Sequence, residues 1–392
     1  MTRLANVCEF IVDCPHSTAK DEGKGYPLIR TPNIGKGRLL LDGVHRVSEN
    51  VYNKRNARAI PQDDDLIFAR EAPAGNVAIV KNGEKVCLGQ RTVLLRPNKE
   101  LVNADFLTYF LLAPEQQYGL LGTANGATVA HVNIPTIREL KINLPPLEVQ
   151  RKIADILSTY YDLIENNQKQ IKLLEEAAQR LHKEWFVDLR FPGHETTPIV
   201  DGIPEGWAAS TVGGICDLKK ETVTANKIDT ETPYIGLEHM PRVDFCLSNW
   251  GTAEDVTSNK FQYNEDDIIF GKIRPYFHKV GFALNSGVVS TDSFVMVARD
   301  GLWGLLLMTV FDKAFVDYTY QTCKEGAKMP RADWKQMEKY PVLIPEESIL
   351  KQFENYIWIV TRKIKALALQ NHTLTEARDR LLPKLMSGEI EV

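Results

Sequence analysis

The strongest constraint on the fold of this chain is an internal repeat of about 200 residues. Gly126-Ala127 aligns with Gly326-Ala327, and Leu144-Pro145 aligns with Ile344-Pro345, each at an offset of 200 residues. The same offset continues through a helical stretch, where the aligned pairs are Ile153 and Phe353, Ile164 and Ile364, Leu174 and Leu374, Ala177 and Ala377, Arg180 and Arg380, and Leu181 and Leu381. One such match arises by chance, but an ordered series at a single offset predicts a tandem duplication.

Earlier in the chain the offset between the repeats drifts, as expected if their loops differ in length. Asp64-Asp65-Leu66-Ile67-Phe68 aligns with Asp266-Asp267-Ile268-Ile269-Phe270, and Pro27-Leu28-Ile29 aligns with Pro233-Tyr234-Ile235. The chain has 392 residues, which is too long for one ordinary core. We therefore expect two domains of similar fold.

Composition places the chain among ordinary soluble proteins. Apolar residues make up 44% and charged residues 25%, which are usual values for globular domains. The apolar run Leu302–Phe311 is about half as long as a membrane span, and the N-terminal residues lack the apolar core of a signal peptide. The six cysteines form no Cys-x-x-Cys pair and have no histidine cluster beside them. We expect a cytoplasmic protein with reduced thiols, no bound metal and no membrane contact.

Each repeat begins with about 145 residues in which short apolar segments alternate with Gly, Pro, Asn and Asp, a pattern typical of short strands and turns. Leu66–Ala69 and Ile268–Phe270 are examples of such segments. Helical stretches at Ala104–Leu112 and Trp303–Tyr318 interrupt the predicted strands. The fold class predicted for each domain is therefore α+β, with helices and strands mixed along the chain.

A long helix is predicted to follow each α+β region. After Pro145-Pro146, about forty residues contain neither Pro nor Gly, and apolar residues recur at alternating spacings of four and three. Such a heptad seam is typical of a helix, here about 60 Å long, that packs on a partner helix. The seam positions are Ile153, Leu157, Tyr160, Ile164, Asn167, Ile171, Leu174, Ala178, Leu181 and Trp185 in the first repeat, and Phe353, Ile357, Val360, Ile364, Leu367, Asn371, Leu374, Arg378, Leu381 and Leu385 in the second.

One asparagine interrupts each seam, and a buried asparagine usually fixes the register of a coiled coil by bonding to a polar partner. Asn167 and Asn371 occupy different heptad classes, which is the pairing that an antiparallel arrangement requires. We predict an antiparallel coiled coil in which these two residues face each other. Residue numbers across the seam then sum to 538, so that Ile153 lies opposite Leu385. The alternative is that each helix packs only on its own domain.

The predicted boundaries are residues 1–146 for the first domain, 147–190 for the central helix, 191–345 for the second domain and 346–392 for the C-terminal helix. Two similar domains at opposite ends of an antiparallel helix pair are related by an approximate two-fold axis. Such a rod holds the domains at most about 60 Å apart, and duplex DNA presents one turn per roughly 34 Å. This geometry suits contact with two DNA sites that are one to two turns apart.

Four segments of the sequence carry a family resemblance. They are Leu144–Ala154 with the helix that follows it, Leu181–Phe186, Pro204-Glu205-Gly206-Trp207, and Leu381–Ile390. In this order they resemble the specificity subunit of type I restriction–modification systems, and the resemblance covers the whole chain. One departure is that the first domain lacks the Pro-x-Gly-Trp opening of the second.

The resemblance implies that two target-recognition domains each recognise one half of a bipartite sequence in double-stranded DNA, while the helices set the length of the unspecified gap. It also implies two methyltransferase subunits as partners, which use S-adenosylmethionine to methylate adenine N6. A motor–nuclease subunit that depends on ATP and Mg²⁺ joins in some assemblies. The chain itself would hold no cofactor. A different class of function stays open, namely a two-domain scaffold that binds proteins without recognising DNA.

The search for catalytic motifs favours a protein that is not an enzyme. The sequence contains no Gly-x-x-x-x-Gly-Lys-[Ser/Thr] phosphate loop. Asp63-Asp64-Asp65 could bind Mg²⁺, but its repeat partner is Glu265-Asp266-Asp267 and both precede a buried strand, so a solvated turn is the preferred interpretation. Asn143–Leu147 has the wrong residue order for the Asn-Pro-Pro motif of amino-methyltransferases.

The candidate DNA-binding residues are polar or cationic side chains on loops and strand edges, because such groups contact phosphates and base edges. The formal net charge is −4, so any basic surface must be local. The candidates are Arg30, Lys36, Arg38, Arg70, Gln90, Arg91, Asn125, Thr128 and His131 in the first domain, and Lys272, Arg274, His278, Lys279, Thr291, Lys328 and Arg331 in the second. The sequence does not indicate which base each one would recognise.

Overall fold

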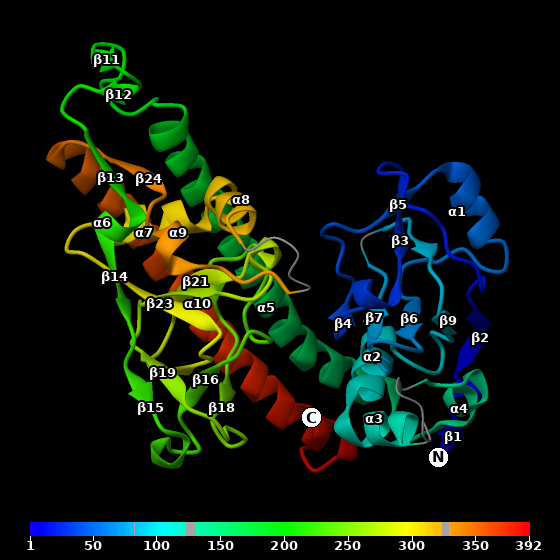
Figure 1. Cartoon of the computed structure of the whole chain (residues 1–392). Coiled ribbons are helices and arrows are strands. Elements are labelled where there is room, and N and C mark those ends of the chain that lie inside the picture. The colour runs from blue at the N-terminus through cyan, green and yellow to red at the C-terminus, as the bar shows by residue number, and fades with distance from the viewer. Residues whose placement is uncertain (82, 123–130, 324–328) are drawn as a thin grey trace. The chain divides into compact units, whose positions relative to one another are not determined.

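The structure is a computed structural model, and it describes residues 1–81, 83–122, 131–323 and 329–392 (Figure 1). The chain divides into two compact units. Unit 1 comprises Met1–Ile164 and Leu374–Val392, and unit 2 comprises Glu165–Thr373. Each unit therefore contains one α+β region together with parts of two long helices.

The centre of unit 1 is a five-stranded sheet with the order β2-β9-β6-β7-β4. Its strands β2, β9, β6 and β7 pair antiparallel, whereas β4 pairs parallel with β7. The strands are β2 (Cys8–Asp13), β9 (Thr92–Pro97), β6 (Leu66–Ala69), β7 (Val77–Ile79) and β4 (Gly37–Arg38).

Unit 2 repeats this sheet with the order β14-β23-β20-β21-β17, and again the last pair alone is parallel. Its strands are β14 (Cys216–Lys219), β23 (Ser293–Ala298), β20 (Ile268–Gly271), β21 (Val280–Ala283) and β17 (Cys246–Leu247). The same order and the same strand directions in both units confirm the predicted duplication and the α+β class.

Further small sheets also correspond between the units. In unit 1, β3 (Tyr26–Ile29) pairs with β5 (Arg46–Val47) and with β8 (Cys87–Leu88), and β1 (Thr2–Arg3) pairs with β10 (Lys141–Ile142). In unit 2 the corresponding sheet has the order β15-β19-β22-β16-β18, with strands β15 (Thr222–Val223), β19 (Lys260–Tyr263), β22 (Gly287–Val289), β16 (Pro233–Ile235) and β18 (Gly251–Thr252). Two further pairs are β13 (Ala208–Thr211) with β24 (Pro341–Ile344), and β11 (Ile199–Val200) with β12 (Ile203–Pro204).

Short helices accompany the sheets. They are α1 (Glu49–Arg55), α2 (Ala104–Leu112), α3 (Pro114–Leu121) and α4 (Ile134–Glu139) in unit 1, and α6 (Val212–Ile215), α7 (Trp303–Phe311), α8 (Lys313–Gln321) and α9 (Trp334–Met337) in unit 2. The single helix expected at Trp303–Tyr318 is wrong, because the chain breaks at Asp312. Asp312 has an extended backbone, and its side chain caps α8 by accepting a hydrogen bond from the backbone N–H of Ala314.

The central strands are buried on both faces. Leu66 and Phe68 of β6 lie in one apolar cluster, whereas Ile67 lies in a second cluster on the other face of the sheet. In unit 2, Ile268 and Ile269 of β20 divide between two clusters in the same way. Alternate side chains of a strand point to opposite faces, so a strand covered on both sides needs the continuous apolar runs that the sequence has at these positions.

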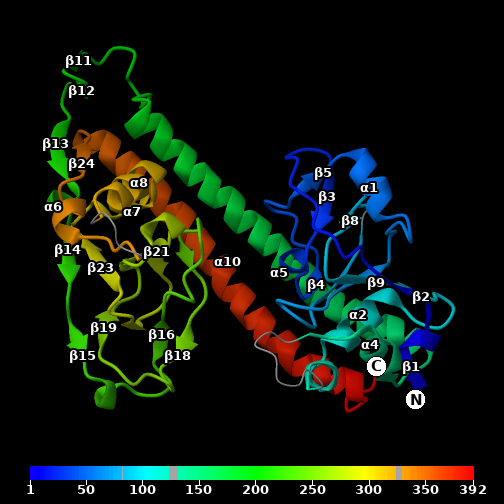
Figure 2. The same cartoon turned by 45° about the vertical axis from the view of Figure 1, so that its right-hand side comes forward.

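The two long helices are α5 (Leu147–His182), with 36 residues, and α10 (Glu347–Ser387), with 41 residues. Within unit 2 they lie side by side (Figure 2). The Nδ2 of the buried Asn167 donates to Oδ1 of Asn371 at 2.9 Å and to Oε1 of Gln370 at 3.0 Å. Farther along, the ring of Trp185, which follows α5, lies 5.9 Å from the ring of Phe353. Residue numbers rise on one helix as they fall on the other, which confirms the antiparallel coiled coil and its predicted register.

The same pairing continues within unit 1, where Ile153 and Leu385 share one apolar cluster. The guanidinium carbon of Arg378 lies 4.7 Å from the ring centroid of Tyr161. Tyr161, rather than the expected Tyr160, is the buried residue of this turn, and its ring stacks on that of Tyr109 in α2 at 4.7 Å. The helices therefore pair with each other and also pack on their own domains, so the alternative of packing on the domain only is wrong.

The two acidic segments are turns, as predicted, and Asp63 and Glu265 are exposed, but several of their carboxylates also form ion pairs. Asp64 binds the ammonium groups of Lys81 and Lys99, at 3.2 Å and 2.8 Å. In unit 2 the carboxylates of Glu265 and Asp266 bind Lys365 and Arg362 of α10. The sequence did not indicate these ion pairs, because the paired cations are distant in sequence. Across the described ranges, no helix combines the length and the apolar character needed to cross a membrane.

Candidate nucleic-acid interface

Three segments of each α+β domain meet at one place, which we call junction 1 in the first domain and junction 2 in the second. In junction 1 the backbone N–H of Arg70 donates to the carbonyl of Arg91 at 3.0 Å, and the carbonyl of Arg70 accepts from Val132 at 3.0 Å. In junction 2 Lys272 takes the place of Arg70, with hydrogen bonds to Asp292 at 2.7 Å and from Ala332 at 2.9 Å. The backbone arrangement is thus conserved between the repeats.

Arg70 is the inner cation of junction 1. Its Nε donates to the Val132 carbonyl at 3.0 Å, one terminal nitrogen contacts Asp13 at 3.3 Å, and the other contacts Nε2 of His131 at 2.8 Å. The side chain is only 12% exposed. Arg70 therefore holds the three segments together and presents little surface to a ligand.

The outer residues of junction 1 form an ion-pair network. Arginine stays protonated, so Nε2 of His131 must accept the hydrogen bond from Arg70, and Nδ1 of His131 then donates to Oε1 of Glu71 at 2.6 Å. The other carboxylate oxygen of Glu71 binds Arg91 at 2.7 Å. Arg91 has a left-handed backbone with φ of 65° and a side chain that is 55% exposed. Gln90 accepts a hydrogen bond from the hydroxyl of Thr18 at 3.0 Å.

Lys272 is the inner cation of junction 2. Its ammonium donates to the carbonyl of Thr291 at 2.7 Å and lies 4.5 Å and 5.2 Å from the ring centroids of Phe294 and Phe261. Burial, together with the nearby Arg331, lowers the pKa of Lys272 to about 8. An amine enclosed by rings and a carbonyl is a structural cation here, as Arg70 is in the first domain.

Arg331 is the outer cation of junction 2. One of its terminal nitrogens binds Oδ1 of Asp292 at 2.7 Å, and the two side chains are 53% and 41% exposed. The backbone position of His131 in the first domain is taken by Arg331 in the second, and that of Arg91 is taken by Asp292. Each junction therefore exposes one arginine paired with one carboxylate.

Several sequence candidates lie elsewhere in their units. Arg38 binds Asp162 of α5 at 2.7 Å, and Lys279 donates to the Leu237 carbonyl. Arg274 has a left-handed backbone with φ of 52°, and among the described residues its buried Nε has no hydrogen-bond partner. The same holds for the Nε of Arg30, whereas Lys36 is exposed. Three candidates, Asn125, Thr128 and Lys328, lie outside the described residues.

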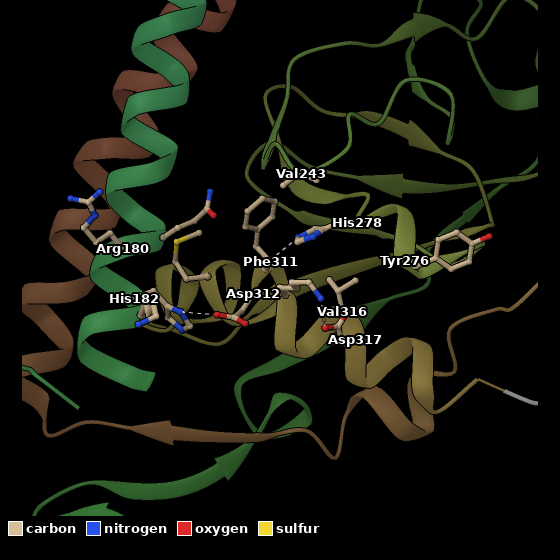
Figure 3. Close-up of a pocket in the computed structure, with 13 residues that line it drawn as sticks. Arg180, His182, Val243, Tyr276, His278, Phe311, Asp312, Val316 and Asp317 are labelled. Atoms are coloured by element: carbon tan, nitrogen blue, oxygen red, sulfur yellow. Dashed lines mark hydrogen bonds and ion pairs between the residues drawn. The ribbon is translucent and has the colours of Figure 1, made fainter. Parts of the chain in front are cut away.

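His278 faces a cleft in unit 2 rather than junction 2. The cleft has a volume of about 710 Å³ and lies between the end of α5 and the break between α7 and α8 (Figure 3). Nε2 of His278 contacts the Phe311 carbonyl at 2.7 Å, which accepts the proton. His182 is buried in the cleft wall, where burial lowers its pKa to about 4. Its Nδ1 lies 3.7 Å from the carboxylate of Asp312.

The cleft residues do not form a recognisable catalytic arrangement, and within the described ranges no three His, Cys, Asp or Glu residues are grouped as metal ligands would be. The sequence search missed Asp13 and Glu71, which pair with the candidate residues of junction 1, whereas Asp292 was noted only as part of the segment 290–292. The search selected Arg, Lys, Asn, Gln, Ser and Thr as possible DNA contacts, and carboxylates were not among the selected residue types. The position of Glu71, directly after Arg70 and at the end of a buried strand, was the available signal.

Two α+β repeats, each followed by a long helix that pairs antiparallel with the other, define a class of duplicated proteins in which the same surface occurs twice. Residues 1–176 match the family described as the type I restriction modification DNA specificity domain. The first α+β domain and most of α5 therefore match a type I restriction–modification specificity domain.

Relatives align along most of the chain. The specificity subunit of the type I restriction enzyme MjaIX from Methanocaldococcus jannaschii is 27% identical over 369 residues, which cover 89% of this chain and 83% of that protein. The HindI specificity subunit from Haemophilus influenzae is 22% identical and covers 83% and 86% respectively. The S subunit structure from M. genitalium has the same fold, with a TM-score of 0.59, 15% identity and coverage of 98% and 95%.

Proposed function

We propose that this chain is the DNA-recognition subunit of a type I restriction–modification complex and that it recognises a bipartite target, one half with each α+β domain. The observation that carries the proposal is the duplicated junction, which exposes an arginine at corresponding places of two domains. Arginine side chains contact both phosphates and base edges of DNA. Only contacts to base edges distinguish one sequence from another, so recognition of a target requires them. Exposed arginines at local sites also reconcile DNA binding with a formal net charge of −4.

The helices α5 and α10 are proposed to set the length of the unspecified gap between the half-sites. Their buried Asn167–Asn371 pair supports this role, because it fixes one antiparallel register. We place the functional boundaries at residues 1–146, 147–190, 191–345 and 346–392. In this arrangement each domain can be exchanged separately while the helices keep the spacing.

The proposed partners are two methyltransferase subunits, which would use S-adenosylmethionine to methylate adenine N6, and a motor–nuclease subunit that would use ATP and Mg²⁺. The chain itself is proposed to be non-catalytic, to hold no cofactor and to work in the cytoplasm. In support, its relatives are named as specificity subunits of restriction enzymes. The two-fold repeat of the chain also offers two similar surfaces for two copies of one partner.

Methylation mapping tests the proposal directly. DNA is sequenced for N6-methyladenine from cells that carry this chain with its neighbouring methyltransferase subunit, and from cells with the methyltransferase subunit alone. We expect a gapped, bipartite motif that appears only when this chain is present. Absence of the motif, with both subunits folded and present, would favour the protein-binding scaffold instead.

A further inference from the structure

We propose that the exposed pairs Arg91–Glu71 and Arg331–Asp292 each recognise a G·C base pair, one in each half of the bipartite target. The inference rests on the proposed DNA-recognition function and names the chemistry of the contact. Each junction contains an inner cation, Arg70 or Lys272, that contacts other groups of the protein, and an outer arginine, Arg91 or Arg331, with an exposed side chain.

The inner cations are poorly placed to contact a base. Arg70 uses Nε and both terminal nitrogens within the protein. The ammonium of Lys272 is held by a carbonyl and lies against two aromatic rings. These contacts would have to break before either cation could bind DNA, and for Arg70 the breaks would leave partly buried polar groups without their partners.

The outer arginines have donors to spare. A guanidinium carries five N–H groups in a planar fork. Among the described residues, the ion pairs of Arg91 and Arg331 each use one terminal nitrogen, and both side chains are more than half exposed. The ion pair with Glu71 or Asp292 restricts rotation of the arginine side chain. Less conformational entropy is therefore lost when the remaining N–H groups of the guanidinium bind a ligand.

The paired carboxylate favours a base edge over a phosphate as the ligand. A phosphate would approach Glu71 or Asp292 and meet a like charge. The major-groove edge of a G·C pair instead offers two acceptors, N7 and O6 of guanine, and one donor, the N4 amino group of cytosine. An arginine fork beside a carboxylate is complementary to this pattern, since arginine binds guanine N7 and O6 and a carboxylate accepts from cytosine N4.

Both junctions keep the arginine–carboxylate combination, although they place its members at different positions: Asp292 takes the place of Arg91, and Arg331 takes the place of His131. In junction 1 the arginine precedes β9 and the carboxylate follows β6. In junction 2 the carboxylate precedes β23, and Arg331 comes from the segment that pairs with Ile273. A structural ion pair would be expected to keep its residues in place after duplication. The presence of an exposed arginine–carboxylate pair in both junctions, built from different positions, points to a shared ligand chemistry.

The test compares Arg91→Gln and Arg331→Gln in the complex with the methyltransferase subunits, by mapping methylation on a library of DNA targets. Arg3→Gln and Arg299→Gln are matched controls, because these arginines are 53% and 50% exposed and also pair with a carboxylate in their own units. We expect each junction variant to lose about 10- to 100-fold of its preference for G·C at one position of one half-site. The control variants should keep the wild-type motif.

Arg91→Lys and Arg331→Lys give a second readout that does not depend on losing a charge. A lysine would keep a phosphate contact but lose the bidentate fork, so we expect the same relaxation of base preference. A half-site that contains only A·T pairs would overturn the inference, and so would a uniform loss of methylation with unchanged preference. A wild-type complex without any gapped motif would instead refute the proposed function itself.

Discussion

The buried carboxyl of Glu175 offers a quantitative test of how α5 holds the second domain. Its Oε1 accepts hydrogen bonds from the backbone N–H groups of Phe245 and Cys246, each at 3.1 Å, at the start of the edge strand β17. Burial, reinforced by the nearby Asp244, raises the pKa of Glu175 to about 8. We predict that Glu175→Gln, which keeps an acceptor oxygen and removes the ionisation, stabilises the protein at neutral pH.

Proton linkage gives the sign and the size of this effect. The pKa of Glu175 is 4.5 for the ordinary group and about 8 in the folded protein, so between these values the folded state binds more protons than the unfolded state. Stability contributed by this group therefore falls as the pH rises from about 4.5 to about 8. At pH 7 the cost is about 3 kcal/mol, at 1.36 kcal/mol for each of about 2.5 pH units.

Urea unfolding of the wild type and of Glu175→Gln, measured at pH 4.5 and at pH 7, checks the prediction. We expect equal free energies of unfolding at the lower pH and a more stable variant at the higher pH. Glu176→Gln, at the exposed neighbouring position, is the control and should show no such pH-dependent difference. A variant that is less stable than the wild type at pH 7, or a difference that does not change with pH, would refute the argument.

Three further predictions concern the helices and the domains. Asn167→Ala removes both hydrogen bonds of the buried Nδ2 and should lower the free energy of unfolding by about 1–3 kcal/mol, measured with urea; a change below about 0.5 kcal/mol would argue against a register role. Deleting two heptads from each long helix shortens the pair by about 21 Å, so methylation mapping should show a gap shorter by roughly six base pairs. An altered half-site with an unchanged gap would contradict the spacer role. Replacing residues 1–146 with the corresponding domain of another family member should change one half-site only, and a change in both halves would deny separate recognition.

The features that could be predicted from the sequence are those that depend on a local residue pattern or on the internal repeat. The heptad seam places Asn167 opposite Asn371 because helical periodicity is fixed by backbone geometry, and the pairing found in the structure follows that arithmetic. The break at Asp312 was missed because the apolar pattern continues through it, and only the cap on Ala314 reveals the end of one helix and the start of another.

The junctions could not be predicted in the same way, because they depend on contacts between residues far apart in the sequence. Arg70 and Arg91 look alike in the sequence, as two cations at strand ends. The structure separates them, since one is enclosed by Asp13 and His131 and the other is exposed beside Glu71. A search restricted to hydrogen-bond donors could not find the carboxylates that distinguish these two environments.

The two junctions share their backbone hydrogen bonds but differ in their side chains. The backbone hydrogen bonds that join the three segments are the same in both repeats, so the scaffold constrains the place of the site. The side chains at the joined positions differ: Arg70 corresponds to Lys272, and Arg91 corresponds to Asp292. A scaffold that keeps its backbone contacts while its side chains diverge can present different chemistry at the same place in each repeat. Two unlike half-sites can therefore be recognised by one duplicated domain without any change in fold.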